Sequence, residues 1–311
     1  MNRQLVVALT EAVPADLIRE VFLPTTNMTS CRTICCAESL ADAGMKRIII
    51  TGRMINEASV RRLPSLAART QIVAVIDHFR HAELLSQCLR QNGNRTGSEI
   101  QVLIEVDLGR QSTGVCPGPD ITRLAAATAH LPGLKVVGVF AAADQGEVGS
   151  KADSFDDGHS STVTDPIVTV AEHALRSIRE VAADCREIVV KTSSVGGATF
   201  FDDRVTSLIV SPFLSTTKLT IDPILPPSVT LISTVISRPT LEWCVVDVGT
   251  MILGGAADVY VHAPSGAIIQ HSTDDTSTLL LSGEAIDMRI GDTVELAMQN
   301  PERLLRGIFS M

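Results

Sequence analysis

Short runs of apolar, often β-branched residues recur along the first two-thirds of the chain, and helix-like segments separate most of them. Parallel strands that are buried on both faces have this near-continuous apolar character, whereas helices repeat apolar residues with their own period. Eight such runs predict a (β/α)8 TIM-type barrel. A doubly wound open sheet is the alternative, but its first turn is usually rich in glycine, and the first turn here, ALTEAVP, has none. The runs are residues 4–9, 33–37, 47–52, 71–77, 100–109, 134–141, 187–193 and 205–211.

After the last of these runs the pattern changes. Prolines gather at residues 223–227, and short strand-like runs follow with Gly, Asp and Ser between them. Regularly spaced short strands are typical of a small antiparallel β-domain. We therefore expect a barrel domain over residues 1–215 and a smaller β-domain over residues 216–311.

The composition narrows the possible functions. A net charge of −9, without a long basic run, argues against nucleic acid as a partner. No stretch approaches the roughly 20 apolar residues that a membrane-spanning helix needs, so we expect no membrane partner. Seven scattered cysteines are typical of reduced thiols in a cytoplasmic protein. Cys31, Cys35 and Cys36 are interpreted as small apolar strand residues, because no second cluster of metal ligands follows them.

Charged residues collect where the predicted strands end. In a (β/α)8 barrel the active site lies at the carboxyl ends of the strands, so these residues share one mouth. Carboxylates and a lysine held close together there can act as general acid and base. The candidates are Glu11, Asp107, Arg110, Lys191 and His159, the last in a long polar connection over residues 144–165. For each of them a salt bridge, a helix cap or a solvated surface position is the structural alternative.

Two further histidines, His78 and His81, stand at the start of the helix predicted after the fourth strand. The first turn of a surface helix is commonly solvated. We therefore expect both side chains to face water rather than to bind a ligand.

Four phrases of the sequence occur in an order typical of one enzyme family: VLIEVDLGRQSTGV (102–115), LPGLKVVGVFA (131–141), TVISRPTLEWCVVDVGTMILGG (234–255) and LLLSGEAIDMRIGDTVELAMQN (279–300). They resemble the D-threonine aldolase / D-serine dehydratase-like family, whose members are fold type III pyridoxal-phosphate (PLP) enzymes with an alanine racemase-like barrel. The resemblance covers most of the chain from about Arg32 onward. It implies a small-molecule substrate, PLP as cofactor, and a homodimer with sites at the subunit interface.

The positions that carry this family's chemistry differ in the present chain. The lysine that binds PLP in the family follows strand one and corresponds to a position near Thr10, whereas the first lysine here is Lys46. The arginine that faces the pyridine nitrogen falls on Ser112, and a zinc-binding histidine falls near Thr276, so no metal site is expected. What remains is a loose cradle whose backbone N–H groups suit an anion or a phosphate. Its residues are Ser193, Ser194, Gly196 and Gly197.

Three functions are consistent with these observations. The first is a repurposed enzyme that works without PLP, by acid–base chemistry of the lyase, isomerase or cyclase type, on a small anionic or carbonyl-bearing substrate. The second is a PLP-dependent lyase, an aldolase or dehydratase of 3-hydroxy amino acids, with Lys191 in the role of the missing lysine. The third is a non-catalytic binding protein. The charge retained at the predicted mouth favours the first hypothesis, which needs no cofactor, over the third.

Overall fold

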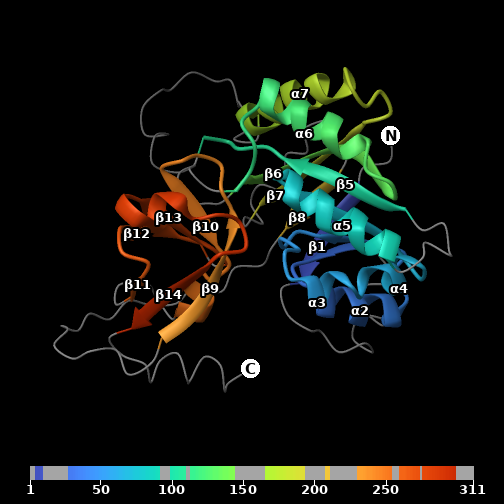
Figure 1. The fold of residues 1–311 in the computed structure, drawn as a ribbon. Coiled ribbons are helices and arrows are strands. Elements are labelled where there is room, and N and C mark those ends of the chain that lie inside the picture. Colours follow the sequence, from blue (N-terminus) through green and yellow to red (C-terminus); the bar gives the residue numbers. More distant parts are fainter. Residues whose placement is uncertain are drawn as a thin grey trace, which may run out of the picture. The chain divides into compact units, whose positions relative to one another are not determined.

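The computed structural model of the chain describes residues 4–9, 27–91, 99–109, 113–143, 165–192, 207–210, 230–253, 259–273 and 275–298. The chain divides into two compact units (Figure 1). Unit 1 comprises residues 1–109 and 114–213, and unit 2 comprises residues 110–113 and 214–311. The boundary predicted after residue 215 lies outside the described residues and stays a prediction.

Unit 1 is a closed barrel of parallel strands in sequential order, so the predicted barrel is confirmed. The barrel closes because β1 pairs in parallel with β8, with Leu5 opposite Leu208 and Val7 opposite Val210. The strands are β1 (Gln4–Leu9), β2 (Met28–Cys31), β3 (Arg47–Ile50), β4 (Gln71–Ile76), β5 (Ile100–Glu105), β6 (Leu134–Ala143), β7 (Glu187–Thr192) and β8 (Ser207–Val210).

Helices follow most of the strands and lie outside the barrel (Figure 1). Apolar side chains of the helices, such as Leu40, Leu85 and Leu175, pack against the outward-facing residues of the strands. The described helices of unit 1 are α2 (Ile34–Ala43), α3 (Glu57–Val60), α4 (Leu63–Ala67), α5 (Phe79–Gln91), α6 (Pro119–Ala129) and α7 (Asp165–Arg179).

The second strand differs from the prediction. Residues 33–37 were expected to form it, but the strand is β2 and the segment that starts at Ile34 is helical. Thr33 adopts an extended conformation and its hydroxyl accepts a hydrogen bond from the backbone N–H of Cys36 at 3.2 Å. A side-chain cap of this kind satisfies a donor that the first helical turn would otherwise leave unpaired, and so it fixes the helix start. The local cap therefore outweighs the strand preference of the apolar run.

The strands of the barrel carry two sets of apolar side chains. One set packs against the helices, and the alternating set packs in the lumen, as the two-residue period of a strand requires. At the amino ends of the strands the lumen is polar: the Arg47 guanidinium lies 2.7 Å from the Glu187 carboxylate and 3.1 Å from Gln101 Oε1. The lumen cluster contains Met28, Ile49, Val73, Val75, Leu103, Val137, Phe140 and Val189.

Unit 2 contains an antiparallel sheet with the strand order β11-β14-β9-β10-β13-β12, which agrees with the predicted β-domain. Its core is formed by buried residues such as Val235, Cys244, Leu279 and Leu296. The strands are β9 (Thr230–Ser237), β10 (Trp243–Val246), β11 (Val259–Ala263), β12 (Ala267–Ser272), β13 (Ser277–Leu281) and β14 (Thr293–Met298). Two short helical segments, α8 (Thr250–Leu253) and the 3₁₀ helix η4 (Gly283–Asp287), accompany them.

Two charged residues of unit 2 organise its turns. The Arg238 guanidinium donates to the carbonyl oxygens of Trp243 at 3.0 Å and Ile286 at 2.7 Å, and thereby joins the β9–β10 turn to η4. Asp247 Oδ1 accepts hydrogen bonds from the Ser233 hydroxyl and the Thr234 N–H, both at 2.8 Å. Arg238 and Asp247 therefore have structural roles in unit 2.

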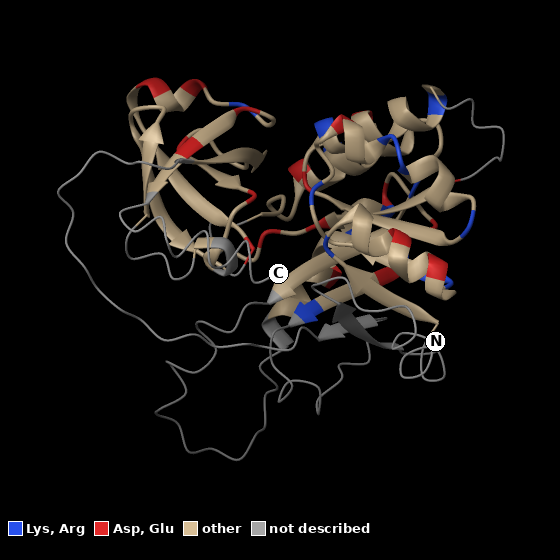
Figure 2. Cartoon of the chain, turned by 90° about the horizontal axis from the view of Figure 1, so that it is seen from below, with Lys and Arg blue, Asp and Glu red and all other residues tan. Residues whose placement is uncertain are grey.

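Charged residues of both signs are spread over the helices of unit 1, whereas the described charged residues of unit 2 are mostly acidic (Figure 2). An acidic surface repels polyanions such as nucleic acids. Among the described residues, no helix combines the length and the apolar character needed to cross a bilayer.

Truncation of a lumen side chain should destabilise unit 1 strongly. Leu103 is fully buried in the lumen cluster, so Leu103→Ala should lower the free energy of unfolding by about 2–5 kcal/mol. The control Val181→Ala, at a side chain that is 41% exposed, should change it by less than about 0.5 kcal/mol. Urea unfolding followed by helical circular dichroism measures both, because the long helices lie in unit 1. Equal effects of the two substitutions would contradict the packed lumen.

Candidate functional site

Two of the predicted catalytic residues, Asp107 and Lys191, lie in the described part of the structure. The others, Glu11, Arg110 and His159, lie outside the described residues and stay predictions. The same holds for the predicted anion cradle, which consists of Ser193, Ser194, Gly196 and Gly197.

The carboxyl ends of the parallel strands form the barrel mouth, and the strand period decides which side chains face the lumen there. On β7, Val189 belongs to the lumen cluster, so Lys191 faces the lumen two residues nearer the mouth. On β5, Leu103 belongs to the same cluster and Glu105 follows it on the same face. A lysine and a carboxylate therefore line the mouth on different strands.

A buried ion cluster joins three neighbouring strand ends at this mouth. Arg53, three residues after β3, lies between Asp77 after β4 and Glu105 at the end of β5. Arg53 Nε is 3.2 Å from Asp77 Oδ1, Arg53 Nη2 is 3.4 Å from Asp77 Oδ2, and Nη2 also forms an ion pair with Glu105. No side chain of the three is more than 5% exposed. Buried charges of this kind require partners, because water no longer solvates them.

His81 extends this cluster, and the prediction that it faces water is wrong. Its side chain is 1% exposed, and Nδ1 lies 3.2 Å from Asp77 Oδ1. His78 is exposed, as expected, and its Nδ1 accepts the N–H of Arg80 at 3.0 Å at the start of α5. Partial desolvation and the neighbouring His81 lower the pKa of His78, against the opposing effect of Asp77, which suits a ring nitrogen that accepts a hydrogen bond.

Residues 107–109, which directly follow Val106 after the end of β5, form a compact turn that the ion cluster anchors. The Asp107 carboxylate accepts the N–H of Gly109 at 2.9 Å, and the returning chain donates the Gly114 N–H to Asp77 Oδ2 at 3.1 Å. Gly114 has a φ of +116°, and a Cβ there would lie 2.6 Å from the backbone nitrogen of Asp107, so only glycine fits. Val115 then pairs with Val106, just beyond the end of β5, in an isolated parallel bridge. The half-buried Asp107 is thus held at the mouth by its own turn.

Lys191 differs in position from the other described lysines. Its half-buried side chain stands at the mouth, and its neighbour across the strands on β6 is Ala142, a small residue that packs against the lumen cluster. Lys46 directly precedes β3, and Lys135 is the second residue of β6, so both lie at the amino ends of the strands. Lys191 is therefore the described lysine that is placed for chemistry at the mouth.

Other groups near the mouth are less suited to chemistry. Partial desolvation and the carboxylates of Asp107 and Asp120 raise the pKa of Cys116, which makes this thiol a weak nucleophile. In the described part of the chain, no group of three or more His, Cys, Asp or Glu side chains is arranged to hold a metal ion. The described mouth thus offers a lysine and carboxylates.

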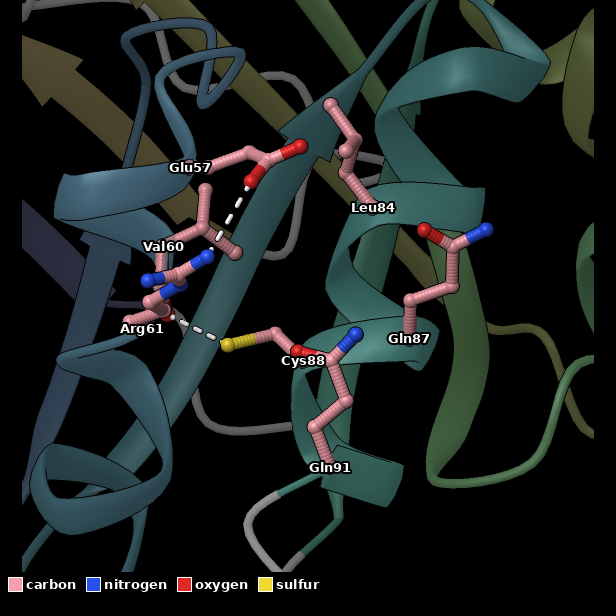
Figure 3. Close-up of a pocket in the computed structure, with 7 residues that line it drawn as sticks. All are labelled: Glu57, Val60, Arg61, Leu84, Gln87, Cys88 and Gln91. Carbon is pink, nitrogen blue, oxygen red and sulfur yellow. Dashed lines mark hydrogen bonds and ion pairs between the residues drawn. The ribbon is translucent and has the colours of Figure 1, made fainter.

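A surface pocket lies elsewhere, on the outside of the barrel between α3 and α5 (Figure 3). In it, the exposed Arg61 pairs with Glu57 at 3.3 Å, and the Cys88 thiol donates to the carbonyl oxygen of Val60 at 3.1 Å. The pocket lies between helices on the outside of the barrel, and both its Arg61 and its Cys88 already have partners. It is therefore not part of the candidate site at the mouth.

Sequence reasoning misses Arg53 and Glu105. One signal was available: Glu105 interrupts the apolar run VLIEV, and a carboxylate in a buried strand requires a cationic or hydrogen-bonding partner. Nothing local identifies Arg53 as that partner, since it lies 52 residues away in the sequence.

Removal of the arginine from the ion cluster should be far more costly than removal of a surface arginine. Arg53→Met leaves two buried carboxylates without their cation, so the free energy of unfolding should fall by about 3–5 kcal/mol. The matched control Arg61→Met breaks only an exposed pair and should cost less than about 1 kcal/mol. Urea unfolding measures both, and a loss at Arg53 as small as that at Arg61 would show that the cluster is not closed to water.

Comparison with solved structures shows the same fold. The chain superposes on D-threonine aldolase from Filomicrobium marinum with a TM-score of 0.56 at 18% identity, over 98% of this chain and 82% of that chain. The TM-score with D-threo-3-hydroxyaspartate dehydratase from Delftia sp. HT23 is 0.53 at 16% identity, over 98% of this chain and 85% of that chain. At these identities the likeness establishes the fold and not the activity.

Sequence comparison finds closer similarity over part of the chain than the structural superposition does. A segment covering 35% of the chain is 31% identical to D-threonine aldolase of an Arthrobacter species, and a segment covering 41% is 28% identical to 3-hydroxy-D-aspartate aldolase of Paracoccus denitrificans. These segments span only 29% and 31% of the two relatives. The sequence model of the alanine racemase N-terminal domain matches residues 3–194, which include all strands of the barrel except β8. With most of its length matched in this way, the chain belongs to the alanine racemase N-terminal domain family.

Proposed function

We propose that this protein is a lyase of small 3-hydroxy amino acids in which Lys191 supplies the amine that holds PLP. The observation that carries the proposal is the position of Lys191 on the lumen face of β7, at the barrel mouth. The similarity to two aldolases and to the fold of a dehydratase of such substrates supports this hypothesis over the PLP-independent one.

Whether this chain can hold PLP depends on which strand carries the lysine that attaches it. The family resemblance places the lysine after β1, where this chain has Thr10, and no lysine precedes Lys46. PLP attached in that manner does not fit. A lysine on β7 reaches the same lumen from two strands away, because only β8 separates β7 from β1 in the closed barrel.

The remaining residues have separate roles in this proposal. When bound, PLP would supply an electron sink for the carbon from which a bond breaks. Lys191 would bind it, and the segment that follows in the sequence, with Gly196 and Gly197, would receive its phosphate on backbone N–H groups. Asp107 would accept the proton of the substrate's 3-hydroxyl group, because its carboxylate is half-buried and held by the turn at Gly109.

A second function is favoured by a separate observation. Because the position after β1 has no lysine, the mouth could work by acid–base chemistry alone, as a lyase, isomerase or cyclase acting on an anionic or carbonyl-bearing substrate. Glu11, Asp107, Arg110 and His159 would then carry the reaction, with Lys191 as a charge partner. A non-catalytic binding protein would show neither covalent cofactor nor turnover.

Cofactor attachment distinguishes these functions. After addition of PLP, we expect a visible absorbance band that borohydride abolishes, and a PLP-modified peptide that contains Lys191. Lys191→Ala should lose both signals, whereas the control Lys135→Ala, at the amino end of β6, should keep them. A colourless protein, or modification that persists in Lys191→Ala, would overturn the assignment of PLP to Lys191.

Turnover tests the proposed base. In a panel of D- and L-3-hydroxy amino acids, release of an aldehyde would report cleavage of a carbon–carbon bond, and release of ammonia would report dehydration. Asp107→Asn keeps a side chain that can accept the Gly109 N–H but removes the negative charge, so kcat should fall by about 10²–10⁴-fold. The control Asp120→Asn, at an exposed residue of α6, should leave kcat unchanged. An unchanged kcat in Asp107→Asn would exclude Asp107 as the base.

A further inference from the structure

Asp77 directly follows β4, and its two carboxylate oxygens have different partners at the barrel mouth. Oδ1 lies 3.2 Å from Arg53 Nε and 3.2 Å from His81 Nδ1. Oδ2 accepts the Gly114 N–H at 3.1 Å. The side chain is closed off from water, so water cannot replace a partner that is lost. One buried carboxylate therefore joins the ion cluster and α5 to the chain that returns after the turn at residues 107–109.

The position of Gly114 is passed on to Asp107, because the two backbones are in direct contact. A Cβ at position 114 would lie 2.6 Å from the nitrogen of Asp107 and 2.8 Å from the carbonyl carbon of Val106. The Asp107 N–H donates to the carbonyl oxygen of Val115 at 2.8 Å, immediately beyond Gly114. A displacement of Gly114 would therefore move the backbone that carries the Asp107 carboxylate.

Glu105 pairs with the same guanidinium but meets the turn in another way. Like Asp77, it is a carboxylate that is no more than 5% exposed and forms an ion pair with Arg53. Its backbone carbonyl accepts the N–H of Val115 at 2.9 Å, a contact that any residue at position 105 can make. The two carboxylates thus allow the stability of the ion cluster to be separated from the position of the turn.

We propose that Asp77 is a positioning residue that holds the turn carrying Asp107 at the barrel mouth, through its hydrogen bond with the Gly114 N–H. This inference rests on the role of Asp107 as the base in the function proposed above. Asp77 is closed off from water and acts through Gly114 rather than on the substrate. Glu105 serves to neutralise Arg53.

Hydrogen exchange, followed by NMR, tests the contact without any need for turnover. In Asp77→Ala the Gly114 N–H loses its acceptor, so it should exchange at least about tenfold faster than in the wild-type protein. The matched variant Glu105→Ala also removes a carboxylate from Arg53 but should leave the Gly114 N–H protected. The buried amide of Val139 on β6 reports global unfolding in both variants.

Two outcomes of this experiment would overturn the proposal. One is an equal acceleration of Gly114 exchange in the two variants, once the exchange of Val139 has been taken into account. The other needs no variant and applies even where Asp77→Ala does not fold. It is a Gly114 N–H that exchanges in the wild-type protein as fast as in an unstructured chain.

The thiol of Cys116 reports where Asp107 lies. Partial desolvation raises the pKa of Cys116, and the Asp107 carboxylate raises it further. Displacement of Asp107 should lower this pKa, so that alkylation of the thiol begins at lower pH. We expect that shift in Asp77→Ala and in Asp107→Asn but not in Glu105→Ala, with the tryptic peptide 111–123 identifying the alkylated cysteine. A shift in Asp107→Asn that is absent from Asp77→Ala would overturn the positioning role.

Turnover distinguishes failure of this inference from failure of the proposed function. In the lyase assay, Asp77→Ala should lower kcat by at least about tenfold with little change in KM, because the base moves while the rest of the mouth stays in place. An unchanged kcat in a variant with a released turn would overturn the role of Asp77 and leave the lyase proposal standing. Absence of turnover in the wild-type protein would contradict the lyase proposal, and the exchange and alkylation results would still decide whether Asp77 places Asp107.

Discussion

The contact on which the barrel mouth depends is the ion pairing of Arg53 with Asp77 and Glu105. Each charge would be expensive to bury alone, so each stays in place only while the others are present. The cluster also reaches beyond the strands, because Asp77 accepts the Gly114 N–H and contacts His81 of α5. Strand ends, a helix and the loop after β5 are thereby held in one arrangement.

This arrangement separates two kinds of charged residue at the mouth. Arg53, Asp77 and Glu105 are closed off from water and engaged with one another, so their charges serve the structure. Asp107 and Lys191 are half-buried. Asp107 is held by its hydrogen bond to Gly109, and Lys191 lies on β7 opposite Ala142 of β6, which packs against the lumen cluster. A reactive group needs access to substrate as well as a fixed position, so the two half-buried residues are the better candidates for chemistry.

The strands were predictable from sequence because their signal is local. Apolar β-branched runs such as RIII and QIVAVI lie within the strands they predict, and the strands of the β-domain follow the same rule. The segment ICCA was misassigned because its apolar character is compatible with both a strand and a buried helix, and the Thr33 cap decides between them. The ion cluster could not be predicted in the same way. Arg53 and Glu105 become neighbours only when the barrel brings β3, β4 and β5 side by side, and no local pattern encodes that contact.

The chain has no lysine near Thr10, after β1, but the geometry of a closed barrel allows the proposed attachment of PLP to Lys191 instead. Every strand of a closed parallel barrel delivers its last lumen-facing residue to the same mouth, so a reactive amine is not tied to one strand. Lys191 lies on β7, and only β8 separates β7 from β1 in the closed barrel. Transfer of the amine from β1 to β7 would move the proposed attachment by two strands around the barrel, while the ion cluster on β3, β4 and β5 stays in place. The proposed lyase reaction needs a carboxylate in a fixed position at this mouth, and Asp107 is held there by its hydrogen bond to Gly109 in a turn where only glycine fits at position 114.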